Sequence, residues 1–276
     1  MRFRLPQVRA QSSVCVRIVL CAGLAGLIAA PASAAAQPAV EIEINQTPHT
    51  GDDYINWSPF LARIRISQAD GATGTVAVVL RNQNTAAGGQ VVFAPFKDPW
   101  PAGTTATQDQ LALSVPADGS WVPFVIAGKY GRPSTHDRDA VIEARVGGAG
   151  GATLGRKELM VRVRKNADSL TVDERDRFLD ALAKLKARGG YDVFQQMHSV
   201  VEGQAHSKGH VAHAFLPWHR AMLLAFERAL QAEDASVALP YWRFDRPAPR
   251  VFSPDFMGGP PSSHLRWASR SPLRIP

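Results

Sequence analysis

The stretch SLTVDERDRFLDALAKLKARGG, residues 169–190, marks the point at which the chain changes from one kind of secondary structure to another. Its apolar residues recur three and four positions apart, which predicts a helix with one buried face. This spacing is carried by Phe178, Ala181, Leu182 and Leu185. Thr171 and Glu174 stand in the register of a capping box, and Gly189 is a natural stop. We therefore expect helices from about residue 167 onward.

Before this stretch, from about residue 39 to 165, apolar and polar residues alternate with a period of two. Breaks rich in glycine, such as NQNTAAGG (82–89) and GGAGGATLG (147–155), separate the alternating runs. Short alternating strands with frequent turns are typical of two packed antiparallel sheets. The runs are VEIEI (40–44), ARIRIS (62–67), TVAVVLR (75–81), QVVFA (90–94), QLALSV (110–115), WVPFVI (121–126), AVIEARV (140–146) and ELMVRVR (158–164).

The two patterns together predict an α+β chain of two domains. Residues 37–166 are expected to form an antiparallel β-sandwich, and residues 167–276 a helical domain. No chemistry-bearing motif is evident in the first of these. Its two histidines, His49 and His136, are isolated, and we expect both to lie on the surface or in turns.

Residues 1–36 have the pattern of an export signal that is removed from the mature chain. Basic residues precede the apolar run IVLCAGLAGLIAA, and small residues follow it. The run is too short for a comfortable membrane span, so we expect an exported protein, periplasmic or secreted, without a membrane anchor. Cys15 and Cys21 both fall in this segment. The rest of the chain therefore offers neither disulfides nor thiolate metal ligands.

The formal charge of +7 carries little functional information. Many of the arginines crowd the two ends of the chain, and positive and negative residues interleave between them. No basic stripe with interspersed aromatic residues is visible, so nucleic acid is not an expected partner.

Two further helices are predicted after Gly189. YDVFQQMHSVV (191–201) places Tyr191, Phe194 and His198 on one helix face. After the polar loop EGQAHSKGH, Pro217 fits the first turn of a helix on which His219 shares a stripe with three apolar residues. Those three are Leu223, Phe226 and Leu230.

Inward-facing histidines on two neighbouring helices, with a third in the loop between them, indicate a metal site. Imidazole nitrogens bind copper or zinc, and the lack of nearby carboxylates and thiolates favours copper. The spacing alone does not choose the metal. It also does not say which loop histidine, His206, His210 or His213, joins His198 and His219.

Three segments resemble the first copper-binding half of the tyrosinase and polyphenol oxidase family. They are GGYDVFQQMH (189–198), GHVAHAFLPWHRAMLLAFERALQ (209–231) and VALPYW (237–242), and the resemblance covers roughly residues 166–257. It implies that His198, His210 and His219 bind one copper ion. It also implies oxidation of phenols or catechols to o-quinones by O2. His213 stands where no ligand is expected, and His206 lies in the variable loop, from which it could replace His210. Phe226 and Glu227 follow the helix pattern of the family, and Glu227 can also be interpreted as a solvated helix residue.

The chemistry implied by this type-3 copper family requires a second ion held by a second histidine triad. After His219 the sequence contains only His264. We therefore expect an incomplete copper domain over residues 167–276, with one half-site and doubtful activity by itself. Three explanations are open: a truncated or frameshifted record of a full oxidase, assembly with a separately encoded second half or as a homo-oligomer, or a non-catalytic exported protein that binds copper, a partner or carbohydrate.

Overall fold

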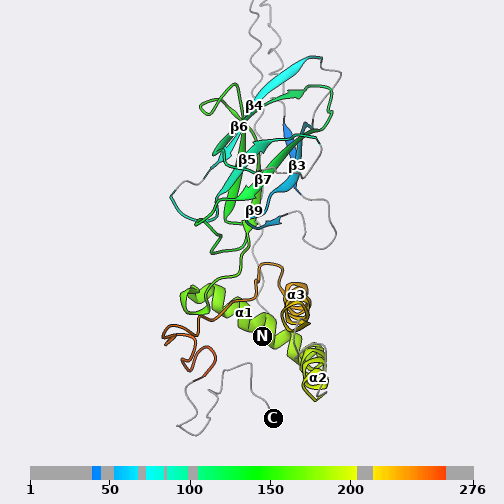
Figure 1. Ribbon diagram of the computed structural model, residues 1–276. Coiled ribbons are helices and arrows are strands. Elements are labelled where there is room, and N and C mark those ends of the chain that lie inside the picture. Colours follow the sequence, from blue (N-terminus) through cyan, green and yellow to red (C-terminus); the bar gives the residue numbers. More distant parts are fainter. Residues whose placement is uncertain are drawn as a thin grey trace, which may run out of the picture. The chain divides into compact units, whose positions relative to one another are not determined.

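The computed structural model describes residues 39–44, 53–67, 73–83, 86–98, 105–203 and 214–258. Within these ranges, nine strands form two sheets, and three α-helices follow them along the chain (Figure 1). The order of the elements matches the expected change from alternating to helical periodicity near residue 167. The export signal predicted for residues 1–36 lies outside the described residues.

The first sheet has four antiparallel strands in the order β1-β3-β7-β5. These are β1 (Val40–Ile44), β3 (Phe60–Ile66), β7 (Val122–Gly128) and β5 (Val91–Pro95). On its outer face Glu41 lies opposite Arg65, and Glu43 opposite Arg63. Each pair forms a hydrogen-bonded ion pair, at 2.8 and 2.7 Å respectively. The charged residues at the polar positions of β1 and β3 are thus paired with residues of opposite charge on the neighbouring strand.

The second sheet has five strands in the order β2-β9-β8-β4-β6. These are β2 (Tyr54–Ile55), β9 (Thr153–Val161), β8 (Ala140–Val146), β4 (Thr75–Asn82) and β6 (Gln110–Pro116). The pairing of β2 with β9 is parallel, which corrects the expectation of a purely antiparallel arrangement. A two-residue strand is too short to show alternation, so β2 could not be found from periodicity.

One buried cluster draws side chains from both sheets. Ile64, Phe93 and Phe124 come from the first sheet, and Leu80, Ile142 and Leu159 from the second; none of the six is exposed. The apolar half of each alternating run therefore points into a shared core. Strand β9 begins five residues earlier than the predicted run, because Thr153–Gly155 pair with β8 after the glycine turn. It ends at Val161.

The helical part consists of α1 (Val172–Ala187), α2 (Gly190–Gly203) and α3 (Phe215–Glu233), preceded by a short 3₁₀ turn at Ala167–Ser169. The predicted capping box is confirmed, with reciprocal hydrogen bonds between Thr171 and Glu174. Gly189 adopts φ 77°, a left-handed conformation that ends α1 at little cost. The predicted stripe of α1 is buried. None of the described helices combines the length and apolarity required to cross a membrane.

The segment after α3 takes part in the helical core although it has no helical periodicity. Val251 and Phe256 are buried, and the Phe256 ring meets Phe178 edge-on at 6.3 Å between centroids. Arg250 donates hydrogen bonds to the backbone carbonyls of Asp168 (3.3 Å) and Leu170 (2.7 Å). This tail therefore covers the start of α1, a role that its proline-rich composition did not indicate.

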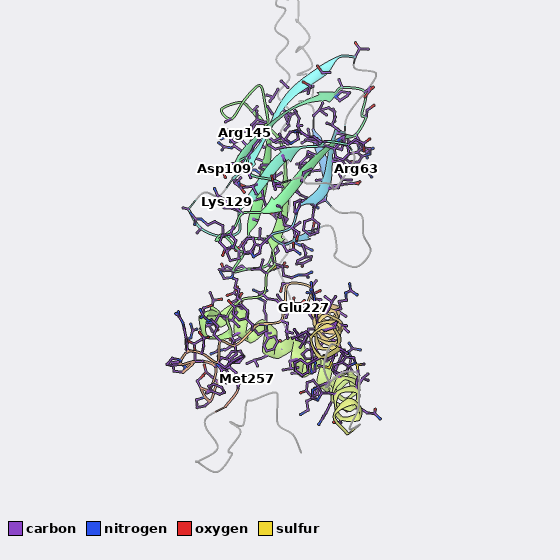
Figure 2. All side chains as sticks on the ribbon, in the orientation of Figure 1. Arg63, Asp109, Lys129, Arg145, Glu227 and Met257 are labelled. Carbon is purple, nitrogen blue, oxygen red and sulfur yellow. The ribbon has the colours of Figure 1, made fainter. Side chains whose placement is uncertain are left out.

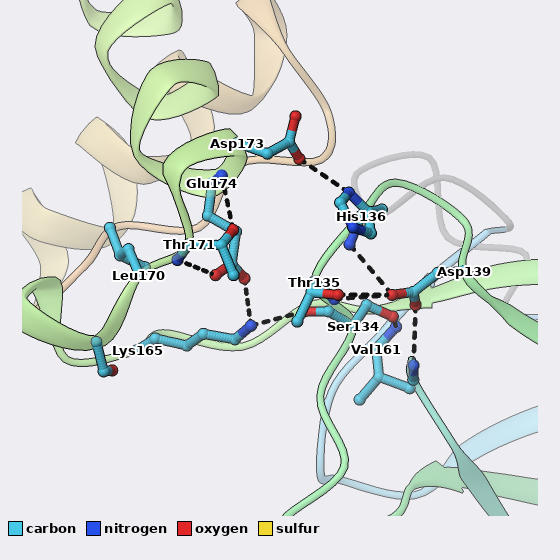
Figure 3. A network of polar contacts seen from close by, with 12 residues as sticks. Ser134, Thr135, His136, Asp139, Val161, Lys165, Leu170, Thr171, Asp173 and Glu174 are labelled. Carbon is cyan, nitrogen blue, oxygen red and sulfur yellow. Dashed lines mark hydrogen bonds and ion pairs between the residues drawn. The ribbon is translucent and has the colours of Figure 1, made fainter. Parts of the chain in front are cut away.

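A polar network joins the last strand to the first helix (Figure 3). Lys165 donates to the carbonyl of Ser134 at 2.7 Å and forms an ion pair with Glu174, the capping-box glutamate. His136 Nδ1 lies 3.2 Å from a carboxylate oxygen of Asp173 in the first turn of α1. His136 is therefore exposed, as predicted, but it links strands and helices rather than standing alone.

Candidate metal centre

Helices α2 and α3 face one another through aromatic side chains. The rings of Tyr191 and Phe194 on α2 both meet Phe226 of α3 edge-on, at centroid distances of 6.0 and 5.2 Å. Edge-to-face contacts of this kind fix the relative orientation of the rings. The shared face predicted for Tyr191, Phe194 and His198 is therefore the face that packs against α3.

The same α2–α3 interface also brings His198 and His219 together. His198 lies one helical turn after Phe194 on α2, and His219 lies two turns before Phe226 on α3. Their ring centroids are 5.7 Å apart, and the ring planes are inclined by 70°. Trp218 lies beside both, at 6.2 Å from His198 and 4.8 Å from His219. Two imidazoles that bind one ion through nitrogens at about 2.0 Å have centroids within roughly 6 Å of each other. The separation of these two rings fits a shared ion.

The tautomer of His219 follows from its backbone contact. Its Nδ1 lies 2.8 Å from the carbonyl oxygen of Phe215, one turn earlier on α3. A carbonyl oxygen only accepts, so Nδ1 carries the proton, and in the neutral ring the lone pair is on Nε2. Metal-binding histidines commonly use this arrangement, in which the second nitrogen orients the ring through a backbone carbonyl.

A cavity of about 310 Å³ opens beside His198 at the α2–α3 interface. Its lining is mostly apolar and comes from both helices: Tyr191, Phe194, Gln195, His198, Ser199, Met222, Leu223 and Phe226. Its size and composition suit a small aromatic molecule. Both histidines are half-buried at the interface between the two helices.

Glu227, which follows the helix pattern of the family, is buried, so the alternative interpretation as a solvated residue is wrong. Glu227, labelled on α3 in Figure 2, is 9% exposed. Its two carboxylate oxygens accept hydrogen bonds from Arg164 at 3.0 and 2.7 Å. The backbone N–H of Leu239 donates to it at 2.8 Å. Burial opposes ionisation, yet the Arg164 hydrogen bond and the other donors hold the pKa of Glu227 below its usual value. Glu227 therefore links α3 to the end of the strand-rich part, through Arg164, and to the LPYW segment (239–242), through Leu239.

The structure does not describe the third predicted copper ligand. His210 lies outside the described residues, as do His206, His213, His49 and His264. Among the residues that the structure describes, no three His, Cys, Asp or Glu side chains converge on a common point. The ligand set His198, His210 and His219 therefore remains a prediction, of which the structure describes two members.

Sequence reasoning missed Arg164, the partner of Glu227. The signal was weak because Arg164 stands at the end of an alternating run and 63 residues before Glu227. Nothing in a local pattern links two such positions. Only the packing of α3 against the end of the strand-rich part brings them together.

A family model for the common central domain of tyrosinase matches residues 188–271. The matched segment begins after α1 and includes α2, α3 and the LPYW segment. It extends past residue 257, where the resemblance seen in the sequence ended. The helix that opens the predicted domain, α1, is outside the match.

Several relatives match part of the chain. A tyrosinase of Streptomyces antibioticus is 49% identical over 104 residues, which cover 35% of this chain and 38% of the relative. Grixazone synthase of Streptomyces griseus is 41% identical over 110 residues, covering 36% of each chain. The hemocyanin beta-C chain unit G of Helix pomatia is 36% identical over 91 residues, covering 30% of this chain and 22% of the relative.

The matches with the Streptomyces proteins thus span well under half of each relative. The segment matched by the family model includes the two helices that carry His198 and His219, and it includes Glu227 of α3. Over residues 188–271, the chain is therefore similar to the common central domain of the tyrosinases.

Proposed function

We propose that the α2–α3 region is a copper site and that the protein takes part in the oxidation of phenols or catechols to o-quinones by O2. The observation that carries this proposal is the 5.7 Å approach of His198 and His219 inside the segment that matches the tyrosinase central domain. His210 would complete the ligand set. An all-imidazole donor set without thiolate suits copper.

The residues of the chain have separable roles in this proposal. His198, His210 and His219 would each give one nitrogen lone pair, and the Phe215 carbonyl holds the His219 ring in the required tautomer. Tyr191, Phe194 and Phe226 form the apolar wall of the cavity beside His198 and would receive the ring of a phenol. Bound copper would supply the redox couple through which O2 accepts the electrons of the substrate. In the overall reaction, two catechols and one O2 give two o-quinones and two waters.

Copper retention tests the site directly. His198→Ala, His210→Ala and His219→Ala should each weaken copper binding by at least about tenfold, since removal of a ligand costs no less than removal of a residue that orients one. Copper per chain after dialysis, measured by atomic emission, gives this value without reference to activity. His136→Ala is the matched control, because His136 is exposed and its ring contacts Asp173 in the first turn of α1.

Two results would change the assignment. If His213→Ala loses copper while His210→Ala keeps it, the third ligand is His213. If all three variants retain copper as well as the control, the site is wrong. Quinone formation from catechol by the copper-loaded chain, followed by absorbance, then tests the reaction separately from the site.

We also propose a division of the chain into domains and a role for its first residues. The strand-rich residues 37–166 would form a β-sandwich domain and residues 167–276 a partial copper domain, a division supported by the two separate buried clusters. Residues 1–36 would direct export. The comparisons favour the oxidoreductase over a binding protein without turnover.

We also propose that a further protein surface covers α2 and α3, either a separately encoded second half or another copy of the chain. Val193 and Met197 of α2 and Leu216, Leu223 and Leu224 of α3 are exposed, although all five are apolar. Exposed apolar groups on adjacent helices are typical of an interaction surface. The copper pair of the family would then be completed by that partner.

A further inference from the structure

A second cavity, of about 460 Å³, lies away from the two histidines, between the strand-rich part and α3. We call it the arginine cavity, after three residues of its lining: Arg162 and Arg164, which follow β9, and Arg228 of α3. The lining also includes three aromatic residues: Tyr54 of β2, Phe60 of β3, and Trp57, which lies between these two strands. The proposed copper function gives this cavity no role.

The lining carries an excess of positive charge. Glu227 is the one carboxylate among the lining residues, and both of its oxygens are already bound by Arg164. Within the described part of the chain, no carboxylate lies at ion-pair distance from Arg162 or Arg228. A guanidinium that loses water without gaining an anion is costly to keep charged. An anion in the cavity would offset that cost.

Arg162 shows this imbalance most clearly. Its guanidinium lies over the ring of Tyr54, with 4.7 Å between its central carbon and the ring centroid, and it donates to the carbonyl of Ala235. Neither contact neutralises its charge. Burial lowers the pKa of Arg162, while the more distant charge of Glu227 partly opposes this effect. The side chain is thus held in place at the cavity with its charge only partly compensated.

The aromatic wall adds a second requirement on the ligand. Tyr54 is buried beneath Arg162, and the ring of Trp57 packs against Tyr130 with 5.7 Å between centroids. Aromatic side chains at the edge of a cavity favour a flat, apolar ligand group, which they contact by offset or edge-on packing. The volume lies within the range of small-molecule sites.

We propose that the arginine cavity binds a small aromatic carboxylate. Its carboxylate would accept hydrogen bonds from Arg162 and Arg228, whose planar guanidinium groups match that geometry. Its ring would lie against Trp57 and Phe60. This site is separate from the proposed copper site, although Glu227 and Phe226, neighbours on α3, face the two cavities.

Benzoate is the probe that tests the proposal, with benzyl alcohol as its uncharged counterpart. The protein is freed of metal with a chelator, so that binding at copper does not contribute. Ligand-observed NMR titration of the full chain should give saturable benzoate binding, with a dissociation constant of about 1 mM or tighter. Benzyl alcohol should bind at least about tenfold more weakly, because it lacks the charge-assisted hydrogen bonds.

The variant Arg228→Gln removes an exposed cavity arginine that makes no ion pair with a described residue, so the fold should persist. It should weaken benzoate binding about tenfold or more. Arg246→Gln is the matched control: it removes the same charge from an exposed site that does not line the cavity, and it should leave binding unchanged. Equal losses in both variants, equal affinity for benzyl alcohol, or no saturable binding near 10 mM benzoate would overturn the proposal. Loss of copper binding in the histidine variants has no bearing on these measurements.

Discussion

The strand-rich part and the helical part bury their apolar side chains in different ways. In the strand-rich part, Ile64, Phe93 and Phe124 are fully buried within a cluster that draws on both sheets. In the helical part, α1 has a buried face, whereas α3 buries only Glu227 and Leu230. The same apolar composition is thus enclosed in one part and half-exposed in the other.

This difference shows which part of the fold is self-sufficient. Each sheet covers the other, and cross-strand pairs such as Glu43 with Arg63 satisfy the outer face. Helix α3 packs against α1 and, through Phe226, against α2, but its Leu216, Leu223 and Leu224 are exposed. Exposed apolar surface contributes nothing to folding until something covers it. The helical part should therefore be the less stable of the two.

Truncation of a core side chain in each part should reveal this difference, and it is the largest effect that we expect. Phe124→Ala should lower the free energy of unfolding by about 3–5 kcal/mol, because the site is closed on all sides and a cavity would remain. Leu230→Ala should cost about 2 kcal/mol, at the low end for such a change, because the looser surroundings can collapse into the space. Urea unfolding followed by circular dichroism measures both.

Leu230 has the same exposure as Phe124, so burial of the side chain alone does not distinguish the two sites. A loss in Leu230→Ala equal to that in Phe124→Ala would show that the helical part is as closely packed as the strands. The two parts would then differ only in the exposed apolar side chains of α3.

The two buried glutamates give a second, smaller contrast. Glu143 on β8 is 1% exposed and is bound by Arg81, Arg145 and Arg156, whereas Glu227 is bound by Arg164 and by the backbone N–H of Leu239. Removal of one member of a buried ion pair costs about 3–5 kcal/mol, and partial exposure of the arginines reduces this value. We expect losses of about 2–3 kcal/mol for Glu143→Gln and about 1–2 kcal/mol for Glu227→Gln at pH 7.

The pH dependence of these variants has a defined sign. Burial raises the pKa of Glu143, but hydrogen bonds from Arg145, Arg81 and Arg156 outweigh it and lower the pKa overall; the pKa of Glu227 is lowered in the same manner. Their stabilisation is complete above the unfolded value of about 4.3 and is lost as the pH falls through the folded pKa. Unfolding free energies measured from pH 7 to pH 2 should therefore decline less steeply in each glutamine variant than in the unaltered protein. Parallel curves would contradict this origin of the stabilisation.

The sequence predicts the fold well where a periodic pattern extends over several residues. The strands around Ile42, Leu80 and Phe124 follow alternating runs, and α1 has the predicted cap at Thr171 and end at Gly189. It fails where a contact depends on distant residues. The two residues of β2 are ordered by parallel pairing with β9, and Phe256 is buried only because α1 offers Phe178.

The candidate site divides in the same way. Helical spacing places His198 on one face with Phe194 and Tyr191, and it places His219 on the apolar stripe of its own helix. The described geometry brings the two imidazole rings together. The depth of burial was predicted less well, because it depends on what covers α3. The role of Glu227 required knowledge of Arg164, which approaches from the end of the strand-rich part.

The smallest effect on stability, but the most direct test of the exposed surface, comes from Leu216 on α3. Leu216 is 75% exposed, so Leu216→Gln should change the free energy of unfolding by less than about 0.5 kcal/mol. If another copy of the chain covers this surface, the variant should self-associate less, as measured by sedimentation velocity over a range of concentrations. Val172→Gln is the matched control, since Val172 is also exposed and apolar but lies at the start of α1. Equal association of both variants and the unaltered protein would remove a second copy of the chain as the occupant of this surface.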